Sequence, residues 1–62
     1  MCESTVYMLK DGVEAPIFES LDRLEERDGH VKMVNLFGEE HVIKAKIKVL
    51  SLVDHKIILE PA

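Results

Sequence analysis

The sequence predicts an all-β fold, a small antiparallel β-barrel or strongly coiled sheet of about six or seven short strands. Short runs of alternating or β-branched residues recur along the chain, and turn-forming pairs separate them every 8–12 residues or so. The alternation also changes phase near residue 50, and a small closed sheet requires a bend or bulge of this kind.

The first 18 residues read as a β-hairpin. Residues 3–9 alternate and are followed by the pair Asp11-Gly12, which suits a tight turn because glycine adopts positive φ without steric cost. A second strand is then expected over residues 13–18. Because Pro16 lacks a backbone donor, this strand should lie at an edge or be broken near that residue.

Residues 19–27 are compatible with either a helix or a strand. Most of them are good helix formers, and two leucines lie three residues apart, which favours a short helix. However, nine residues make a marginal helix, and the following pair Asp28-Gly29 is a strong hairpin signal that requires a strand on each side. We therefore predict strands over residues 19–27 and 30–36.

The remaining chain is predicted to form a further reversal at residues 37–40 and a long alternating segment. One face of that segment carries apolar residues and the other carries lysines: Ile43, Ala45, Ile47 and Val49 against Lys44, Lys46 and Lys48. Leu50 and Leu52 then occupy the lysine parity, which predicts a bulge or bend. A turn at Asp54-His55 leads to a closing strand over residues 56–59.

Composition indicates one small acidic domain spanning residues 1–62. Eight Lys and Arg face twelve Asp and Glu, giving a formal charge of −4, which argues against nonspecific nucleic-acid binding. The single cysteine excludes an intrachain disulfide and favours a cytoplasmic protein. No apolar run reaches membrane-spanning length, and a signal-peptide layout is absent. The core of so short a chain is marginal, so a metal or a partner subunit is expected.

Cys2 is the first candidate metal ligand. Removal of Met1 would expose an α-amine, and that nitrogen and the Cys2 thiolate would close a five-membered chelate ring. Nitrogen and thiolate donors in a square plane suit Ni(II) or Cu(II). Two chains related by a twofold axis would each give one N and one S to an ion between them. The alternative is an idle thiol at the chain terminus.

The three histidines are weaker candidates. If Leu36 pairs with His41 across a four-residue loop, His30 lies about six residues along the first strand, roughly 20 Å away. The two then share no ion within one chain. His55 falls in a different turn, where a solvated histidine is the simpler interpretation.

An RNA-binding face is the alternative function. Lys44, Lys46 and Lys48 would follow a phosphate backbone, while aromatic residues would stack on bases. Lysines on an exposed strand also serve solubility and prevent edge pairing. Acidic residues available to pair with them across strands are Glu19, Asp22, Glu25, Glu26, Asp28, Glu39 and Glu40.

Catalysis has little support, and we predict a non-enzyme. The chain contains neither a glycine-rich phosphate loop nor a nucleophile elbow. The triplet Glu39-Glu40-His41 resembles an acid/base or metal cluster, but adjacent residues on a strand point apart.

Four segments together resemble the CooT family: the Met1-Cys2 start, Leu9-Lys10-Asp11-Gly12, Leu36-Phe37-Gly38-Glu39-Glu40 and Val53-Asp54-His55-Lys56-Ile57. CooT proteins are small bacterial and archaeal proteins, often labelled predicted RNA-binding proteins. Their characterised members bind nickel and assist the maturation of carbon monoxide dehydrogenase.

The resemblance implies a barrel-like subunit, with residues 20–26 in a strand, that forms a homodimer and binds one Ni(II) per homodimer through Cys2. It carries over Cys2 alone as a ligand and none of the histidines. The expected function is that of a metallochaperone for carbon monoxide dehydrogenase or another nickel enzyme.

Overall fold

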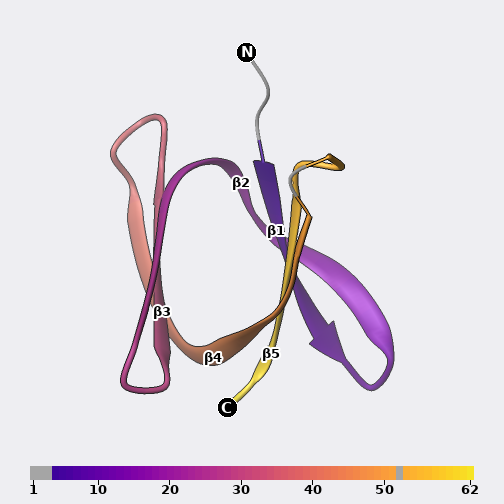
Figure 1. The fold of residues 1–62 in the computed structure, drawn as a ribbon. Helices are drawn as coiled ribbons and strands as arrows, with labels where there is room; N and C mark the ends of the chain where they lie inside the picture. Colours follow the sequence, from indigo (N-terminus) through magenta and orange to yellow (C-terminus); the bar gives the residue numbers. More distant parts are fainter. Residues whose placement is uncertain (1–3, 52) are drawn as a thin grey trace.

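Five β-strands make up the fold in the computed structural model, which describes residues 4–51 and 53–62 (Figure 1). The strands are β1 (Ser4–Lys10), β2 (Val13–Arg27), β3 (His30–Asn35), β4 (Glu40–Ser51) and β5 (Lys56–Pro61). Cys2 and Leu52, two residues in the sequence predictions, lie outside the described residues. Within the described ranges there is no helix long and apolar enough to cross a lipid bilayer.

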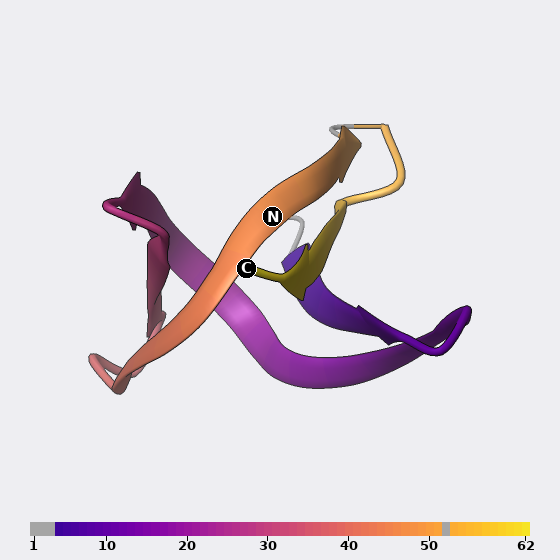
Figure 2. The same cartoon turned by 90° about the horizontal axis from the view of Figure 1, so that it is seen from below.

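The strands follow chain order around a closed barrel, β1-β2-β3-β4-β5, and β5 returns to β1 (Figure 2). Consecutive strands are antiparallel, whereas the closing pair β1–β5 is parallel. The all-β prediction and the barrel are confirmed. The predicted count of about six or seven strands is wrong, because β2 and β4 are long, bent strands that each serve two neighbours along successive halves.

β2 is one continuous strand through Pro16 and through residues 19–27, the segment whose sequence is compatible with either a helix or a strand. Its first part pairs with β1 and its second part, from Leu21, pairs with β3, so residues 19–27 are a strand as predicted. Pro16 lies opposite Tyr7, in the part paired with β1 alone. This half of β2 therefore has one neighbour, and its register with β1 shifts between Pro16 and Phe18, so the predicted irregularity is present although the strand continues. A second irregularity lies at Ser20, whose φ of 56° is rare for a strand residue.

Two turns have the predicted hairpin geometry. Asp11 and Gly12 have φ of 53° and 78°, and Asp28 and Gly29 have φ of 51° and 77°. Two consecutive positive φ angles define the type I′ turn, whose twist matches that of the flanking strands. Both dipeptides were recognisable because aspartate tolerates this conformation and glycine adopts it without strain.

β4 changes its neighbour in mid-strand. It pairs with β3 up to Lys44 and with β5 from Ala45 onward, while the Ala45 amide donates to the Gly29 carbonyl at 3.1 Å. The register with β5 shifts between Ile47 and Val49, so the predicted irregularity exists. It comes before Val49 and not after it. Val49 is therefore 40% exposed and does not share the inward face as predicted.

The core is contributed by all five strands. Its buried members are Val6, Phe18, Val31, Met33, Ala45, Ile57 and Leu59, with Met8, Leu21, Leu24, Ile43 and Ile47 packed against them. This set closes the interior of the barrel with aliphatic side chains and one aromatic ring, as expected for a small barrel filled by its own side chains.

A lysine on β5 reinforces the closing edge. Lys56 Nζ lies 2.6 Å from Glu14 Oε1 on β2 and 5.0 Å from the centre of the Tyr7 ring on β1. The hydrogen bond to the Glu14 carboxylate raises the pKa of Lys56 above its ordinary value of 10.5. One side chain thereby links three strands at the parallel junction.

Candidate functional site

The start of β1, which follows the predicted metal ligand Cys2 in the sequence, lies at one end of the barrel. Cys2 itself lies outside the described residues, but Ser4 begins β1 two positions later. The Thr5 amide donates to the His55 carbonyl at 3.0 Å, which joins the beginning of β1 to the β4–β5 turn. Figure 1 shows this turn and the N-terminal side of β1 at the same end of the molecule.

Exposed apolar side chains lie at that end. Val49, Leu50 and Val53 are 40%, 57% and 89% exposed, and they flank the end of β4 and the turn after it. Ser51 and Thr5 both pair with Lys56, so this surface adjoins the start of β1. The turn is ordered by Asp54, whose amide donates to Ser51 Oγ at 3.3 Å and whose carboxylate accepts from it at 3.2 Å. Val49 and Leu50 are consecutive residues of β4, so their side chains point to opposite faces of the strand.

The histidines lie closer together than predicted. His41 is opposite Met33 and His30 is opposite Lys44, so the assumed pairing of Leu36 with His41 is wrong. The offset between the two histidines is three residues along β3, about 10 Å. Within residues 4–51 and 53–62, there is no group of three or more histidine or acidic side chains arranged to hold a metal ion.

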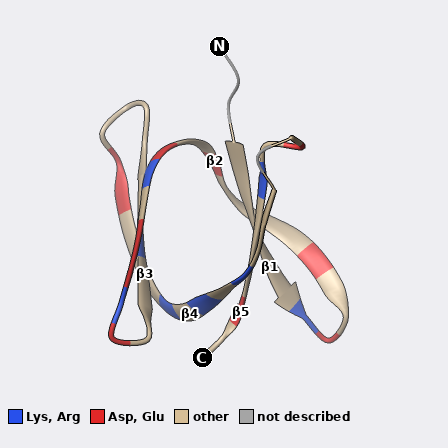
Figure 3. Cartoon of the chain, viewed as in Figure 1, with Lys and Arg blue, Asp and Glu red and all other residues tan. Residues whose placement is uncertain are grey.

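The lysine row is exposed on β4, where basic residues follow one another along the strand (Figure 3). Lys46 Nζ lies 3.4 Å from Glu60 Oε1 on β5, a partner that was not among the predicted acids. Of the aromatic residues, Phe18 is buried in the core. Lys46, the central lysine of the three, thus has an acidic partner on the neighbouring strand.

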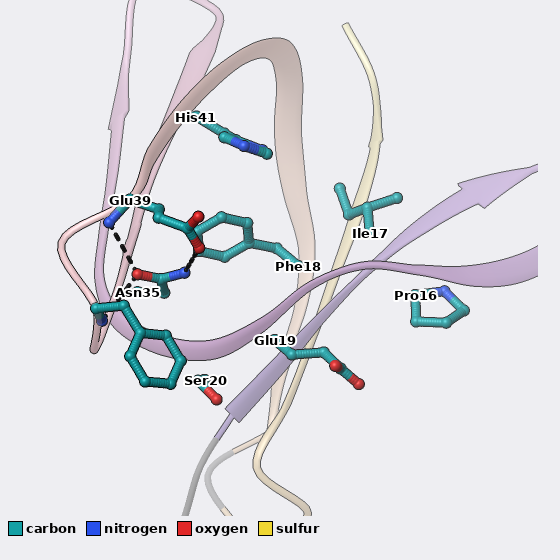
Figure 4. Close-up of a pocket in the computed structure, with 9 residues that line it drawn as sticks. Pro16, Ile17, Phe18, Glu19, Ser20, Asn35, Glu39 and His41 are labelled. Atoms are coloured by element: carbon teal, nitrogen blue, oxygen red, sulfur yellow. Dashed lines mark hydrogen bonds between the residues drawn. The ribbon is translucent and has the colours of Figure 1, made fainter.

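A surface pocket of about 510 Å³ lies between the bend of β2 and the turn that joins β3 to β4 (Figure 4). Its lining comes from residues 16–20 on one side and from the 35–41 segment on the other: Pro16, Ile17, Phe18, Glu19, Ser20, Asn35, Phe37, Glu39 and His41. The bend at Ser20 creates this space, because it turns β2 from β1 toward β3. The Leu36 amide donates to the Ser20 carbonyl at 2.9 Å and joins the two walls.

The buried side chain of Asn35 holds one wall of the pocket in place through three hydrogen bonds. It is 7% exposed, and its Oδ1 accepts hydrogen bonds from the amides of Phe37 and Glu39, both at 2.9 Å. Its Nδ2 donates to Glu39 Oε1 at 2.7 Å, so the two side chains point toward each other (Figure 4). The amide group thus shapes the turn and orients a carboxylate at the pocket wall.

His41 and Glu39 share this pocket, whereas Glu40 does not. The His41 ring packs on Phe18 with centroids 5.0 Å apart and an interplanar angle of 55°. Glu40 instead reaches Lys32 on β3 at 3.4 Å. The prediction that adjacent members of the Glu39-Glu40-His41 triplet point apart is confirmed, but the alternate residues converge.

Sequence reasoning missed Asn35 and the convergence of Glu39 with His41. Two signals were present: an asparagine preceding Phe37-Gly38 in a turn, and the spacing of two residues that places side chains on one strand face. Neither signal identifies the other wall of the pocket, because that wall is formed by residues 16–20 of β2 and its position depends on the bend in this strand.

The chain is similar to proteins of a known family over nearly its whole length. A family model described as CO dehydrogenase accessory protein CooT matches residues 1–60. A crystal structure described as "putative CooT from Carboxydothermus hydrogenoformans" is 39% identical, with a TM-score of 0.87 and coverage of 98% of each chain. No curated protein matches the chain. The resemblance predicted from the sequence is confirmed, and the chain belongs to the CooT family of CO dehydrogenase accessory proteins.

Proposed function

We propose that this protein is a nickel metallochaperone that acts in the maturation of carbon monoxide dehydrogenase or of another nickel enzyme. The observation that carries the proposal is the match of the CO dehydrogenase accessory family over residues 1–60, a range that includes Cys2. An accessory role is non-catalytic, so the proposal includes that the protein is not an enzyme. The single cysteine favours a cytoplasmic location.

The proposed site uses Cys2 from two chains. Each chain supplies a nitrogen and a thiolate, and one Ni(II) is held between them in a square-planar set of donors. Ni(II) displaces thiol protons when it enters, and its later transfer to the client reverses that step. An ion bound only by the dimer stabilises the dimer by mass action.

The exposed residues Val49, Leu50 and Val53 support a homodimer that forms at the N-terminal end of the barrel. They adjoin the start of β1, and Ser4, the first residue of that strand, follows Cys2 by two positions in the sequence. Burial of these side chains contributes roughly 25 cal/mol for each Å² of apolar surface removed from water. A twofold interface is self-complementary, so each of these side chains would contact the partner's surface in two equivalent places.

A titration with Ni(II) tests the metal site. Untagged, reduced protein, with its N-terminus verified by mass, is expected to bind half an equivalent of Ni(II) per chain and to show thiolate-to-nickel charge-transfer absorbance. Cys2→Ser should lose both signals and keep the fold, whereas His30→Gln should retain them. Nickel binding by Cys2→Ser with unchanged stoichiometry would refute the Cys2 site.

The dimer has a separate test with a matched control. Leu50 and Val42 both lie on β4 and are 57% and 58% exposed, but only Leu50 adjoins the start of β1. In sedimentation velocity with Ni(II), Leu50→Glu should shift the protein toward monomer, while Val42→Glu should remain dimeric. Equal effects of the two substitutions would place the interface elsewhere.

We do not propose RNA binding as a second function. That alternative needs a lysine row that contacts phosphates and aromatic rings that stack on bases. Lys46 is paired with Glu60, which weakens the first requirement. Of the aromatic rings, Phe18 is buried and Phe37 is exposed.

A further inference from the structure

The pocket between the β2 bend and the β3–β4 turn has an acidic and aromatic character. Glu19 and Glu39 contribute carboxylates, Phe18 and Phe37 contribute aromatic rings, and the described lining includes no lysine or arginine. Phe37 is 79% exposed. Carboxylates beside an exposed aromatic ring form an environment that attracts an organic cation.

The acidic wall is held in a defined orientation. The buried Asn35 amide fixes Glu39 through its 2.7 Å hydrogen bond, and the same residue fixes the backbone of Phe37. Within the described chain, this hydrogen bond uses Oε1 of Glu39 and leaves Oε2 to other partners. A preoriented carboxylate loses less conformational entropy when it binds a ligand.

We propose that this pocket binds an arginine side chain presented by a partner protein, with Glu39 accepting hydrogen bonds from the guanidinium and Phe37 stacking against it. Arginine fits better than lysine, because its planar guanidinium both stacks on aromatic rings and donates several hydrogen bonds in a fixed fork. The negative charges of Glu19 and Glu39 complement the positive charge of this group.

The surroundings of the pocket favour a protein as the source of the arginine. Ile17 and Phe37 are 38% and 79% exposed, and both line the pocket, where they form an apolar border beside its carboxylates. Protein interfaces commonly consist of a few anchoring aromatic and arginine residues with surrounding contacts that exclude water. A free cationic metabolite would leave that apolar border in contact with solvent.

An added β-strand is the competing occupant of this region, because the first part of β2 pairs on one side only. Pro16 opposes it. Proline has no amide to donate to a new strand, and proteins use it to block edge pairing. Recognition at this position therefore depends on the side chain that enters the pocket.

NMR titration of the full chain without metal tests the proposal. The probe is the blocked tripeptide acetyl-Gly-Arg-Gly-amide, and its controls replace arginine with citrulline, a neutral isostere, or with lysine. The arginine peptide should give saturable amide shifts at Ser20, Phe37, Glu39 and His41, with affinity at least tenfold above that of the citrulline peptide. Absence of saturable shifts, or equal affinity for citrulline, would overturn the proposal.

Variants assign the binding to the two named side chains. Glu39→Gln and Phe37→Ala should each weaken binding at least fivefold without loss of spectral dispersion. Glu40→Gln is the matched control, because Glu40 points toward Lys32 and away from the pocket. Equal weakening by Glu40→Gln would indicate general attraction to an acidic protein and would overturn the assignment.

Two further outcomes concern the partner and the metal. If the same shifts appear when the protein alone is concentrated, and disappear in the double variant Arg23→Gln/Arg27→Gln, the arginine belongs to a second copy and the partner assignment is wrong. The proposal uses neither Cys2 nor nickel. Cys2→Ser should bind the arginine peptide normally, so failure of nickel binding and failure of this site are distinguishable.

Discussion

The carboxylate of Glu26 on β2 accepts a hydrogen bond from the backbone amide of Ile47 on β4, with Oε2 3.0 Å from the nitrogen. β2 and β4 are not neighbours in the barrel. The bond occurs where β4 has left β3 and where its register with β5 shifts. A side chain thus satisfies a backbone donor at the point where the strand changes partner.

Removal of this carboxylate should destabilise the barrel modestly. Glu26→Ala is expected to lower the free energy of unfolding by about 1 kcal/mol, the net value of one hydrogen bond, as measured by urea denaturation. Glu26→Gln keeps an acceptor oxygen and should lose less than Glu26→Ala. Asp22→Ala, on an exposed part of the same strand, is the control. Equal losses for Glu26→Ala and Glu26→Gln would assign the effect to charge.

Asn35 should be the most sensitive polar position. Asn35→Ala removes three hydrogen bonds around a buried group and is expected to cost about 2–3 kcal/mol of unfolding free energy. Asn35→Asp keeps the two bonds from backbone amides but places a second carboxylate beside Glu39. Its stability, followed by urea denaturation, should therefore recover as pH falls and the carboxylates are protonated. A pH-independent deficit in Asn35→Asp would contradict this account.

The contribution of Lys56 to the free energy of unfolding should decrease at high pH. Its pKa is raised in the folded protein, so its stabilising contribution is complete below 10.5 and is lost as pH rises through the folded value. Lys56→Met should therefore be less stable than the parent protein at pH 9, and the difference should shrink above pH 10.5. Urea unfolding of both proteins from pH 8 to 12 measures this, with Lys10→Met as the exposed control. A constant difference across that range would rule out the ion pair as its cause.

A core truncation should affect stability far more than a surface truncation on the adjoining strand. Met33 is 1% exposed, and Met33→Ala is expected to cost about 2–5 kcal/mol through lost burial and a residual cavity. Val42 is 58% exposed, so Val42→Ala should change unfolding free energy by about 0.5 kcal/mol or less. Thermal and urea unfolding measure both. Similar effects would show that Met33 does not form part of a tightly packed core.

Local chemistry made much of the fold predictable. The Asp11-Gly12 and Asp28-Gly29 turns depend on the dihedral preferences of two adjacent residues, so they are recognisable without tertiary information. The strand over residues 19–27 was predicted against its helix propensity, because the turn after it requires a strand. In both cases, the decisive interactions lie within a few residues along the chain.

The errors concern continuity and register. The joining of residues 13–27 into one strand, its bend at Ser20 and the exposure of Val49 depend on which neighbouring strand each half of β2 and β4 meets. Each strand's alternation is compatible with more than one partner, and sequence spacing alone does not choose between them. The assumed pairing of Leu36 with His41 was wrong for the same reason.

By itself, the sequence determined the all-β class and the hairpin turns, because these follow from single residues and their immediate neighbours. Only the tertiary structure decided the five-strand closure through a parallel β1–β5 pair and the meeting of Asn35, Glu39 and His41 with the β2 bend. Closure and convergence join segments far apart in the chain. Their stability comes from the packing of the whole barrel, which no local pattern encodes.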